Sequence, residues 1–106
     1  GDEVLRAVAD AIRGNLRNGD EAGRYGGDEF GVVLPATRPA DATQVAETIQ
    51  RAIRGIGVDA APAERISASI GIAPARAGHA SLEQWIEEAD AALYRAKRGG
   101  RDRIES

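Results

Sequence analysis

The sequence predicts an α/β fold of the α+β sandwich type, in which helices flank a mixed, mainly antiparallel β-sheet. Three observations predict it. With 106 residues, the chain is long enough for one compact domain, residues 1–106. Hydrophobic residues make up 42% of the sequence and charged residues 29%, which is typical of a globular protein. Segments of helical and of strand periodicity follow one another in the order α-ββ-α-β-α-β.

A helix and a β-hairpin are expected first. Residues 2–17 carry apolar side chains at helical spacing with charges between them, and turn-forming residues follow. Residues 22–25 and 30–34 are short strand candidates, and the two glycines between them favour a hairpin. Strand alternation predicts that Phe30 and Val32 share one face of the second strand.

A second helix and a third strand are expected next. Asp41-Ala-Thr-Gln44 resembles a capping arrangement, so the helix should begin there. Apolar residues continue at helical spacing as far as Gly55 and Gly57, which should end the helix. Within residues 66–72, apolar residues alternate with small or polar ones, and this pattern predicts a half-buried strand.

A third helix and a short last strand complete the order. The helix should begin at the capping box Ser81-Leu-Glu-Gln84 and end at Gly99-Gly100. Its predicted buried face consists of apolar residues at helical spacing: Leu82, Trp85, Ile86, Ala89 and Leu93. Residues 103–104 are expected to begin the last strand. Three helices would cover a larger sheet than these few short strands can form. This mismatch suggests that a strand of the sheet is missing from this chain.

The composition excludes several kinds of site. Without cysteine, the chain has no disulfide, no thiolate nucleophile and no zinc–thiolate site. The single histidine, His79, argues against a histidine metal cluster or a Ser-His-Asp triad. A net charge of −3 gives no reason to expect DNA or RNA as a partner.

The chain also lacks the features of an exported or membrane-spanning segment. No apolar run approaches the roughly 20 residues that are needed to cross a bilayer, and no signal peptide opens the sequence. A cytoplasmic location is therefore expected, and a membrane-anchored parent protein stays open.

The stretch Arg24–Phe30, RYGGDEF, places two glycines directly before two carboxylates. Gly26 and Gly27 lack β-carbons, so a ligand could approach their backbone N–H groups closely. Asp28 and Glu29 offer hard oxygen ligands, which suit Mg²⁺ or Mn²⁺. Phosphate donors beside metal ligands are the arrangement used in phosphoryl transfer. On these residues alone, a two-glycine turn with solvated acids remains the simpler interpretation.

Gly26-Gly27-Asp28-Glu29-Phe30 resembles the signature of the GGDEF domain family, the bacterial diguanylate cyclases, which join two GTP molecules into cyclic di-GMP. Further stretches resemble the family in the same order along the chain: GDEVL at 1–5, SIGIA at 69–73, ADAALYRAK at 89–97 and GRDR at 100–103. The resemblance spans the whole chain. It implies a nucleotidyl-cyclase-like fold and a part in bacterial second-messenger signalling.

The resemblance implies roles for the residues of the hairpin. Gly26 and Gly27 would lie against the GTP phosphates. Asp28 would bind the metal ion and take part in deprotonating the attacking 3′-hydroxyl, and Glu29 would help to hold the metal. Phe30 begins the strand behind the turn and receives no chemical role.

Lys97 and Arg101 are one turn apart at the expected end of the third helix, where cations also suit the helix dipole. Their simple interpretation is a solvated basic cap. The resemblance implies instead that they bind the triphosphate and offset negative charge in the transition state.

A second candidate site, Arg17-Asn-Gly-Asp20, precedes the hairpin. Taken alone, it is a helix end followed by a turn. By resemblance, it matches the inhibitory product site of the family, where Arg17 and Asp20 would bind cyclic di-GMP through phosphate and guanine contacts. The family often adds an arginine from the helix after the hairpin, and neither Arg51 nor Arg54 aligns with that position.

By the family's architecture, the missing strand is the first and central one, and its region carries another metal-binding aspartate and the guanine-recognition residues. We therefore expect these 106 residues alone to be inactive, and to be poorly folded or to pair with another chain, because two strand edges lack partners. The complete domain is expected to act as a homodimer with one GTP in each half-site, under an upstream regulatory domain.

Two alternatives remain open from the sequence. The first is a GGDEF-like module that senses GTP or cyclic di-GMP without catalysis. The second is a structural dimerisation module, which explains the α/β pattern but leaves the basic C-terminal stretch as coincidence. The intact acids of the hairpin favour the enzyme.

Overall fold

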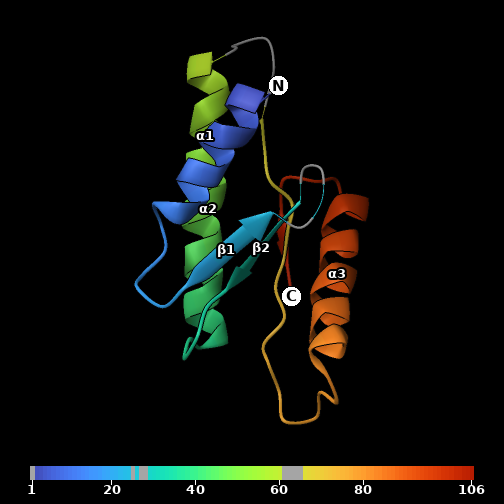
Figure 1. Cartoon of the computed structure of the whole chain (residues 1–106). Helices are drawn as coiled ribbons and strands as arrows, with labels where there is room; N and C mark the ends of the chain where they lie inside the picture. The colour runs from blue at the N-terminus through green and yellow to red at the C-terminus, as the bar shows by residue number, and fades with distance from the viewer. Residues whose placement is uncertain (1, 25, 27–28, 61–65) are drawn as a thin grey trace.

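The computed structural model describes residues 2–24, 26, 29–60 and 66–106. Its elements are α1 (Asp2–Arg13), β1 (Glu21–Arg24), β2 (Phe30–Val33), α2 (Pro39–Ala60), β3 (Ile70–Gly71), α3 (Leu82–Arg98) and β4 (Ile104–Glu105). Their order confirms the predicted one. Figure 1 shows α1 packed along α2 on one side and α3 on the other, with the β1–β2 hairpin extending from α2 toward α3.

Helix α1 ends four residues before the predicted boundary. From Asn15 onward the backbone forms tighter turns, in which Asn15 N–H donates to Ile12 O and Leu16 N–H donates to Arg13 O. Gly14 has a low helix propensity, and the Asn15 side chain donates to Ala11 O, which satisfies a carbonyl at the helix end. Leu16 still packs against the core, so the apolar periodicity extends beyond the helix itself.

Strands β1 and β2 form the predicted antiparallel hairpin. The register pairs Glu21 with Val33 and Arg24 with Phe30. Phe30 packs against the core as expected, whereas Val32 is 36% exposed and Val33 45% exposed. Burial therefore does not alternate along β2: only Phe30 is partly buried, and the strand leaves apolar surface uncovered on both faces.

Helix α2 is longer at both ends than the sequence predicts. It begins at Pro39, a favourable first helical residue, and Asp41 lies in the first turn instead of serving as the cap. It continues through Gly55 to Ala60, because a glycine inside a helix costs only about 1 kcal/mol relative to alanine. The buried side chains of Ile49 and Ile53, which precede Gly55, hold the helix against the core.

Strand β3 is shorter than predicted. It is restricted to Ile70–Gly71 and pairs in parallel with β4, and Ile70 N–H donates to Arg103 O at 2.9 Å. Residues 66–69 have no strand partner within the described part of the chain. A segment with the strand pattern becomes a strand only where a neighbour completes its hydrogen bonds.

Helix α3 confirms the predicted start and end. The Ser81 side chain accepts a hydrogen bond from Gln84 N–H, and the Gln84 side chain accepts one from Ala80 N–H. Gly99 caps the other end and donates to Arg95 O. The predicted buried face is wrong for Leu82, which is 65% exposed, and it omits the most buried residues of the helix: Ala92 and Ala96.

The core lies between α1, α2 and the hairpin. Its buried centre consists of Ile12, Ile49 and Ile53, and side chains from α1, β1, β2 and residues 66–68 surround it. On the opposite side, α3 packs on β3, where Gly71 comes close to the backbone of Ala89 and Leu93.

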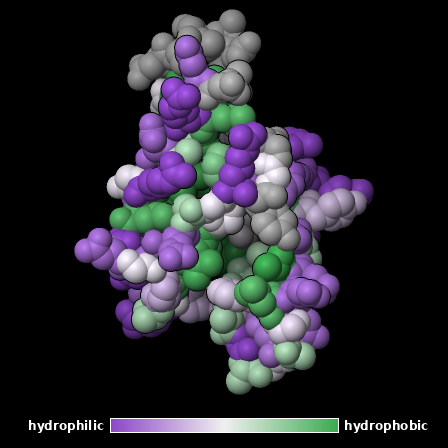
Figure 2. Space-filling view, in the orientation of Figure 1, coloured by the Kyte–Doolittle hydropathy of each residue, from purple (hydrophilic) through white to green (hydrophobic). Residues whose placement is uncertain are grey.

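The described strands form two separate two-stranded sheets, the antiparallel pair β1–β2 and the parallel pair β3–β4. Figure 2 shows apolar side chains around a hollow near the middle of the face that is drawn. In the described residues, no helix has both the length and the apolar character to cross a membrane.

Candidate functional site

The signature hairpin is closed by backbone hydrogen bonds at its outer end. Gly26 N–H donates to Glu29 O at 3.3 Å, and Glu29 N–H donates to Gly26 O at 3.4 Å. The Arg24 side chain also donates to Gly26 O, at 3.3 Å. The expected phosphate-binding residue Gly27 and the expected metal ligand Asp28 lie outside the described residues.

Glu29 and Lys97, which lie far apart in the sequence, meet in the structure. Lys97 Nζ is 3.8 Å from Glu29 Oε1, and the two side chains are 36% and 42% exposed. The ion pair brings the basic end of α3 to the acidic end of the hairpin. Because both groups are partly solvated, its own stabilising effect is small, typically about 0.2–1 kcal/mol.

Close packing of α3 on β3 sets the position of Lys97. A β-carbon at Gly71 would overlap the backbone of Leu93 and Ala89, so only glycine allows this approach. The Trp85 indole N–H donates to Ala73 O at 2.7 Å, which joins the first turns of α3 to the chain after β3. This explains in physical terms why a glycine stands in the middle of the SIGIA stretch.

Arg101 lies beyond the end of α3 rather than on it. Its N–H donates to Ala96 O at 3.0 Å, and its φ of 63° is in the left-handed region. The residue is exposed, and within the described part of the chain its guanidinium has no hydrogen-bond or ion-pair partner. Lys97 and Arg101 therefore lie at the same end of α3, although only Lys97 is helical.

The Arg17–Asp20 stretch forms a tight turn with internal contacts. Asp20 Oδ2 accepts from Arg17 N–H at 2.8 Å, and the Asp20 side chain is only 3% exposed. The Arg17 guanidinium is 66% exposed and donates to Thr37 Oγ1 at 2.7 Å. Both predicted residues are brought together, with Arg17 accessible and Asp20 largely engaged by the turn.

The described residues offer limited material for a metal site. Glu29 is a partly exposed carboxylate, which is a hard oxygen ligand of the kind that Mg²⁺ and Mn²⁺ prefer. In the part of the chain that the structure describes, no group of three His, Asp or Glu side chains could hold a metal ion. The donor type therefore fits a divalent cation, and Glu29 would be one of its ligands.

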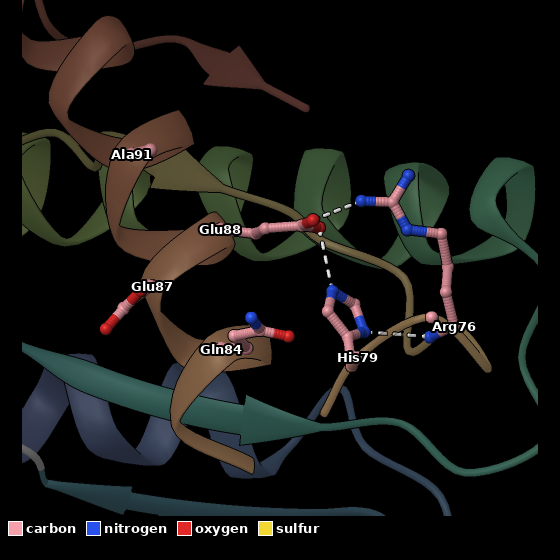
Figure 3. A pocket seen from close by; sticks show the side chains of 7 residues that line it. Arg76, His79, Gln84, Glu87, Glu88 and Ala91 are labelled. Atoms are coloured by element: carbon pink, nitrogen blue, oxygen red, sulfur yellow. Dashed lines mark hydrogen bonds and ion pairs between the residues drawn. The ribbon is translucent and has the colours of Figure 1, made fainter. Parts of the chain in front are cut away.

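An open depression of about 600 Å³ lies beside the N-terminal half of α3, away from the hairpin. Figure 3 shows Glu88 pointing toward Arg76 and His79, while Glu87 points away. Arg76 donates to Glu88 Oε1, His79 Nε2 lies 3.1 Å from Glu88 Oε2, and His79 Nδ1 accepts from Arg76 N–H at 3.0 Å. These contacts fasten the loop before α3 to the helix.

The same contacts change the pKa of Glu88. Desolvation raises this pKa, but the Arg76 guanidinium and the His79 imidazole outweigh it, so the pKa lies below its ordinary value of 4.5.

The structure contains a polar network around Asp102 that the sequence does not predict. Arg54 Nε donates to both carboxylate oxygens of Asp102, at 3.0 and 3.2 Å, and Gln50 Nε2 lies 3.4 Å from Asp102 Oδ1. Arg54 and Asp102 are 48 residues apart in the sequence, so no local pattern predicts their contact. Arg54, which did not align with the expected inhibitory arginine, is thus engaged elsewhere.

Comparison with known protein families gives one match over nearly the whole chain. The family described as "Diguanylate cyclase, GGDEF domain" matches residues 1–103. Among curated proteins, diguanylate cyclase DosC of Escherichia coli K12 is 42% identical over 106 residues, which are 99% of this chain and 23% of DosC. Diguanylate cyclase DgcM of the same strain is 39% identical over 104 residues, 98% of this chain and 25% of DgcM. The chain therefore spans about a quarter of these relatives.

Solved structures resemble the fold as a whole. The GGDEF domain of DgcB from Caulobacter crescentus, in complex with c-di-GMP, has a TM-score of 0.89 and 32% identity, and the match covers 98% of this chain and 63% of that one. Diguanylate cyclase SiaD from Pseudomonas aeruginosa, in complex with its activator SiaC, has a TM-score of 0.87 and 39% identity, over 97% of this chain and 40% of SiaD.

Proposed function

The chain belongs to the GGDEF domain family of diguanylate cyclases, and from this premise we propose that the full-length protein condenses two GTP molecules into cyclic di-GMP with release of pyrophosphate. The observation that carries the proposal is the Lys97–Glu29 ion pair, 3.8 Å long, between the basic end of α3 and the acidic hairpin. A site that holds a triphosphate next to a divalent cation needs these two charges side by side.

Each charged residue has a distinct part in the proposed reaction. Lys97 and the exposed guanidinium of Arg101 bind the triphosphate and offset the negative charge that develops as pyrophosphate leaves. Glu29 and Asp28 hold Mg²⁺ or Mn²⁺, which supplies charge stabilisation at the phosphate oxygens when it is bound. Asp28 also takes part in deprotonating the 3′-hydroxyl that attacks the α-phosphate of the other GTP.

The backbone of the hairpin has its own role. Gly26 is exposed and no atom lies near the position of a β-carbon there, so a phosphate group can approach its backbone closely. We propose that Gly26 and Gly27 together form the surface against which the GTP phosphates lie.

The reaction joins two nucleotides, so two half-sites must face each other. We therefore propose that the active form is a homodimer with one GTP per protomer, controlled by a regulatory domain elsewhere in the full-length protein and located in the cytoplasm. By itself, a single copy of this 106-residue chain is expected to be inactive.

An inhibitory site for cyclic di-GMP is proposed at Arg17 and Asp20. The exposed Arg17 guanidinium can form paired hydrogen bonds with a phosphate or with guanine. The complex of the DgcB domain with c-di-GMP supports a product site in this family. Because the turn already engages Asp20, most of the affinity is expected from Arg17.

The decisive experiment incubates the full-length protein with GTP and Mg²⁺ and measures cyclic di-GMP by chromatography. Asp28→Ala should lower the rate by about 100-fold or more, because an acid–base and metal-binding group is lost. Asp10→Ala is the matched control, since Asp10 is an exposed acid on α1, a helix that carries none of the proposed ligands. Added cyclic di-GMP should slow the wild type, and it should slow Arg17→Ala less.

The outcomes distinguish three hypotheses: an active cyclase, a non-catalytic sensor and a structural dimerisation module. Product formation supports the cyclase, and turnover that survives in Asp28→Ala refutes the role of Asp28. Nucleotide binding without product supports a non-catalytic sensor. If the protein neither binds GTP nor forms product, it is a structural dimerisation module.

A further inference from the structure

The turn after α3 has an unusual backbone. Arg101 and Asp102 have φ values of 63° and 48°, so two consecutive residues other than glycine adopt the left-handed conformation. Aspartate tolerates this region better than most residues, whereas arginine has no such preference. Such a conformation persists only where its surroundings enforce it, and strained residues of this kind concentrate at functional sites.

Three parts of the molecule hold this turn. Arg101 N–H donates to Ala96 O at the end of α3, at 3.0 Å. Asp102 N–H donates to Ser69 Oγ, beside β3, at 3.2 Å. The Asp102 carboxylate accepts from Arg54 of α2, at 3.0 and 3.2 Å. The turn is thus held from α3, from the segment before β3 and from α2.

Gln50 strengthens the attachment to α2. It is 8% exposed, the one buried polar residue in the described part of the chain. Its Nε2 lies 3.4 Å both from Asp102 Oδ1 and from Ala68 O. A buried amide that bridges residue 68 and the turn keeps both of its N–H donors satisfied only while Asp102 stays in place.

All of these contacts involve Asp102 and the backbone, and none of them uses the side chain of Arg101. Its exposed guanidinium, without a hydrogen-bond or ion-pair partner in the described residues, lies at the same end of α3 as Lys97, which contacts Glu29. A fixed backbone that presents an unpaired cation is the arrangement expected of a preorganised anion ligand.

We propose that Gln50, Arg54 and Asp102 are positioning residues, which hold the turn in its left-handed conformation so that Arg101 meets the triphosphate of GTP. The inference rests on the proposed function and adds to it a role for α2, which contributes none of the predicted substrate or metal ligands. The competing explanation is that these contacts only stabilise the packing of α2 against the turn. It predicts that substitution of Arg54 lowers the stability of the protein without a specific loss of GTP affinity.

The test uses the full-length protein with the variants Arg54→Met and, as matched control, Arg51→Met. Arg51 is on the same helix, is exposed, and its side-chain contact is with Thr48. Arg54→Met should raise the KM for GTP about tenfold, because a displaced ligand weakens substrate binding, and it should change kcat much less. Arg51→Met should leave both values unchanged, and Arg54→Lys, which keeps the positive charge, should recover most of the affinity.

A double variant separates positioning from stability. If Arg54 acts through Arg101, then adding Arg54→Met to Arg101→Met should change KM by less than about twofold. Asp102→Asn, which keeps the tolerance for the left-handed region but removes the charge, should reproduce the effect of Arg54→Met. The dissociation constant of a non-hydrolysable GTP analogue should follow the same pattern.

Several results would overturn the inference. Equal KM values for Arg54→Met and Arg51→Met would do so, as would additive effects of Arg54→Met and Arg101→Met. Failure of the proposed function looks different, because the wild type itself would then form no cyclic di-GMP. In that case analogue binding decides: an unchanged affinity in Arg54→Met refutes the positioning role, and a wild type that does not bind the analogue refutes it too.

Discussion

At the scale of single residues, Glu88 shows how a side chain far from the hairpin supports the site. Its carboxylate contacts the side chains of Arg76 and His79, which belong to the loop that precedes α3 (Figure 3). This loop connects β3 to α3, and α3 carries Lys97. The contacts of Glu88 therefore help to fix the start of the helix whose other end faces the hairpin.

Glu88 should make the stability of the domain depend on pH in the acid range. Its pKa in the folded protein is below 4.5, so its contribution is present above pH 4.5 and is lost as the pH falls through the folded-state pKa. Glu88→Gln should lower the melting temperature near neutral pH, and the difference from the wild type should shrink in acid. Thermal melts of the full-length protein from about pH 7 to about pH 3 measure this.

Glu87→Gln is the matched control for this experiment, because Glu87 is an exposed neighbour on α3 that points away from the cluster. If Glu87→Gln and Glu88→Gln had the same melting temperatures at every pH, Glu88 would have no special role.

The site could be predicted only in part at this scale. The resemblance identified Glu29 and Lys97, and the structure brings them together. The left-handed conformation of Arg101 and the attachment of Asp102 to Arg54 left no trace in the sequence, because they depend on contacts between segments 48 residues apart. The roles of Gly27 and Asp28 remain predictions from resemblance.

At the scale of elements, the contact of α3 with β3 depends on a missing side chain. Gly71 brings the strand so close to α3 that Leu93 and Ala89 leave no space for a β-carbon. The buried side chains on this side of α3 are the small Ala92 and Ala96. Close approach gives this pair of elements a well-defined relative position.

Gly71→Ala should therefore destabilise the domain by about 1–3 kcal/mol, the usual cost of overpacking. Urea unfolding of the full-length protein measures the loss. Gly31→Ala is the matched control, since Gly31 is a strand glycine in β2 with no atom within 4 Å of a β-carbon position. Equal unfolding midpoints for the two variants would show that α3 can move away from β3 at no cost.

Element order was predictable from the sequence, whereas several boundaries were not. Periodicity and caps predicted α3 correctly, because Ser81, Gln84 and Gly99 act locally. Glycines were a poor guide to the end of α2, because one glycine costs a helix only about 1 kcal/mol and the helix continues through Gly55 to Ala60. The length of β3 depends on which neighbouring strand is available, and this is a property of the tertiary structure.

At the scale of the whole molecule, two small sheets share one chain. Neither β1–β2 nor β3–β4 has a third strand among the described residues, and an isolated two-stranded sheet is only marginally stable in water. Val32 and Val33 of β2 are exposed, and Figure 2 shows a hollow surrounded by apolar side chains. The apolar surface of the described residues is therefore incompletely buried.

We therefore predict that the 106-residue chain, produced by itself, is poorly folded or associates with another chain. Exposed strand edges and apolar side chains favour such association. Amide NMR spectra combined with light scattering test this prediction. Sharp, dispersed peaks from a monomer would contradict it.

The packing of α3 has one more consequence. Leu93 meets Gly71 near the middle of the helix, and Lys97 reaches Glu29 one turn later. Since an α-helix turns by about 100° per residue, inserting or deleting one residue between these contacts would swing Lys97 away from the hairpin while leaving every side chain chemically intact. The number of residues between Leu93 and Lys97 therefore sets the direction of the Lys97 side chain, and a one-residue change in length here should separate Lys97 from Glu29.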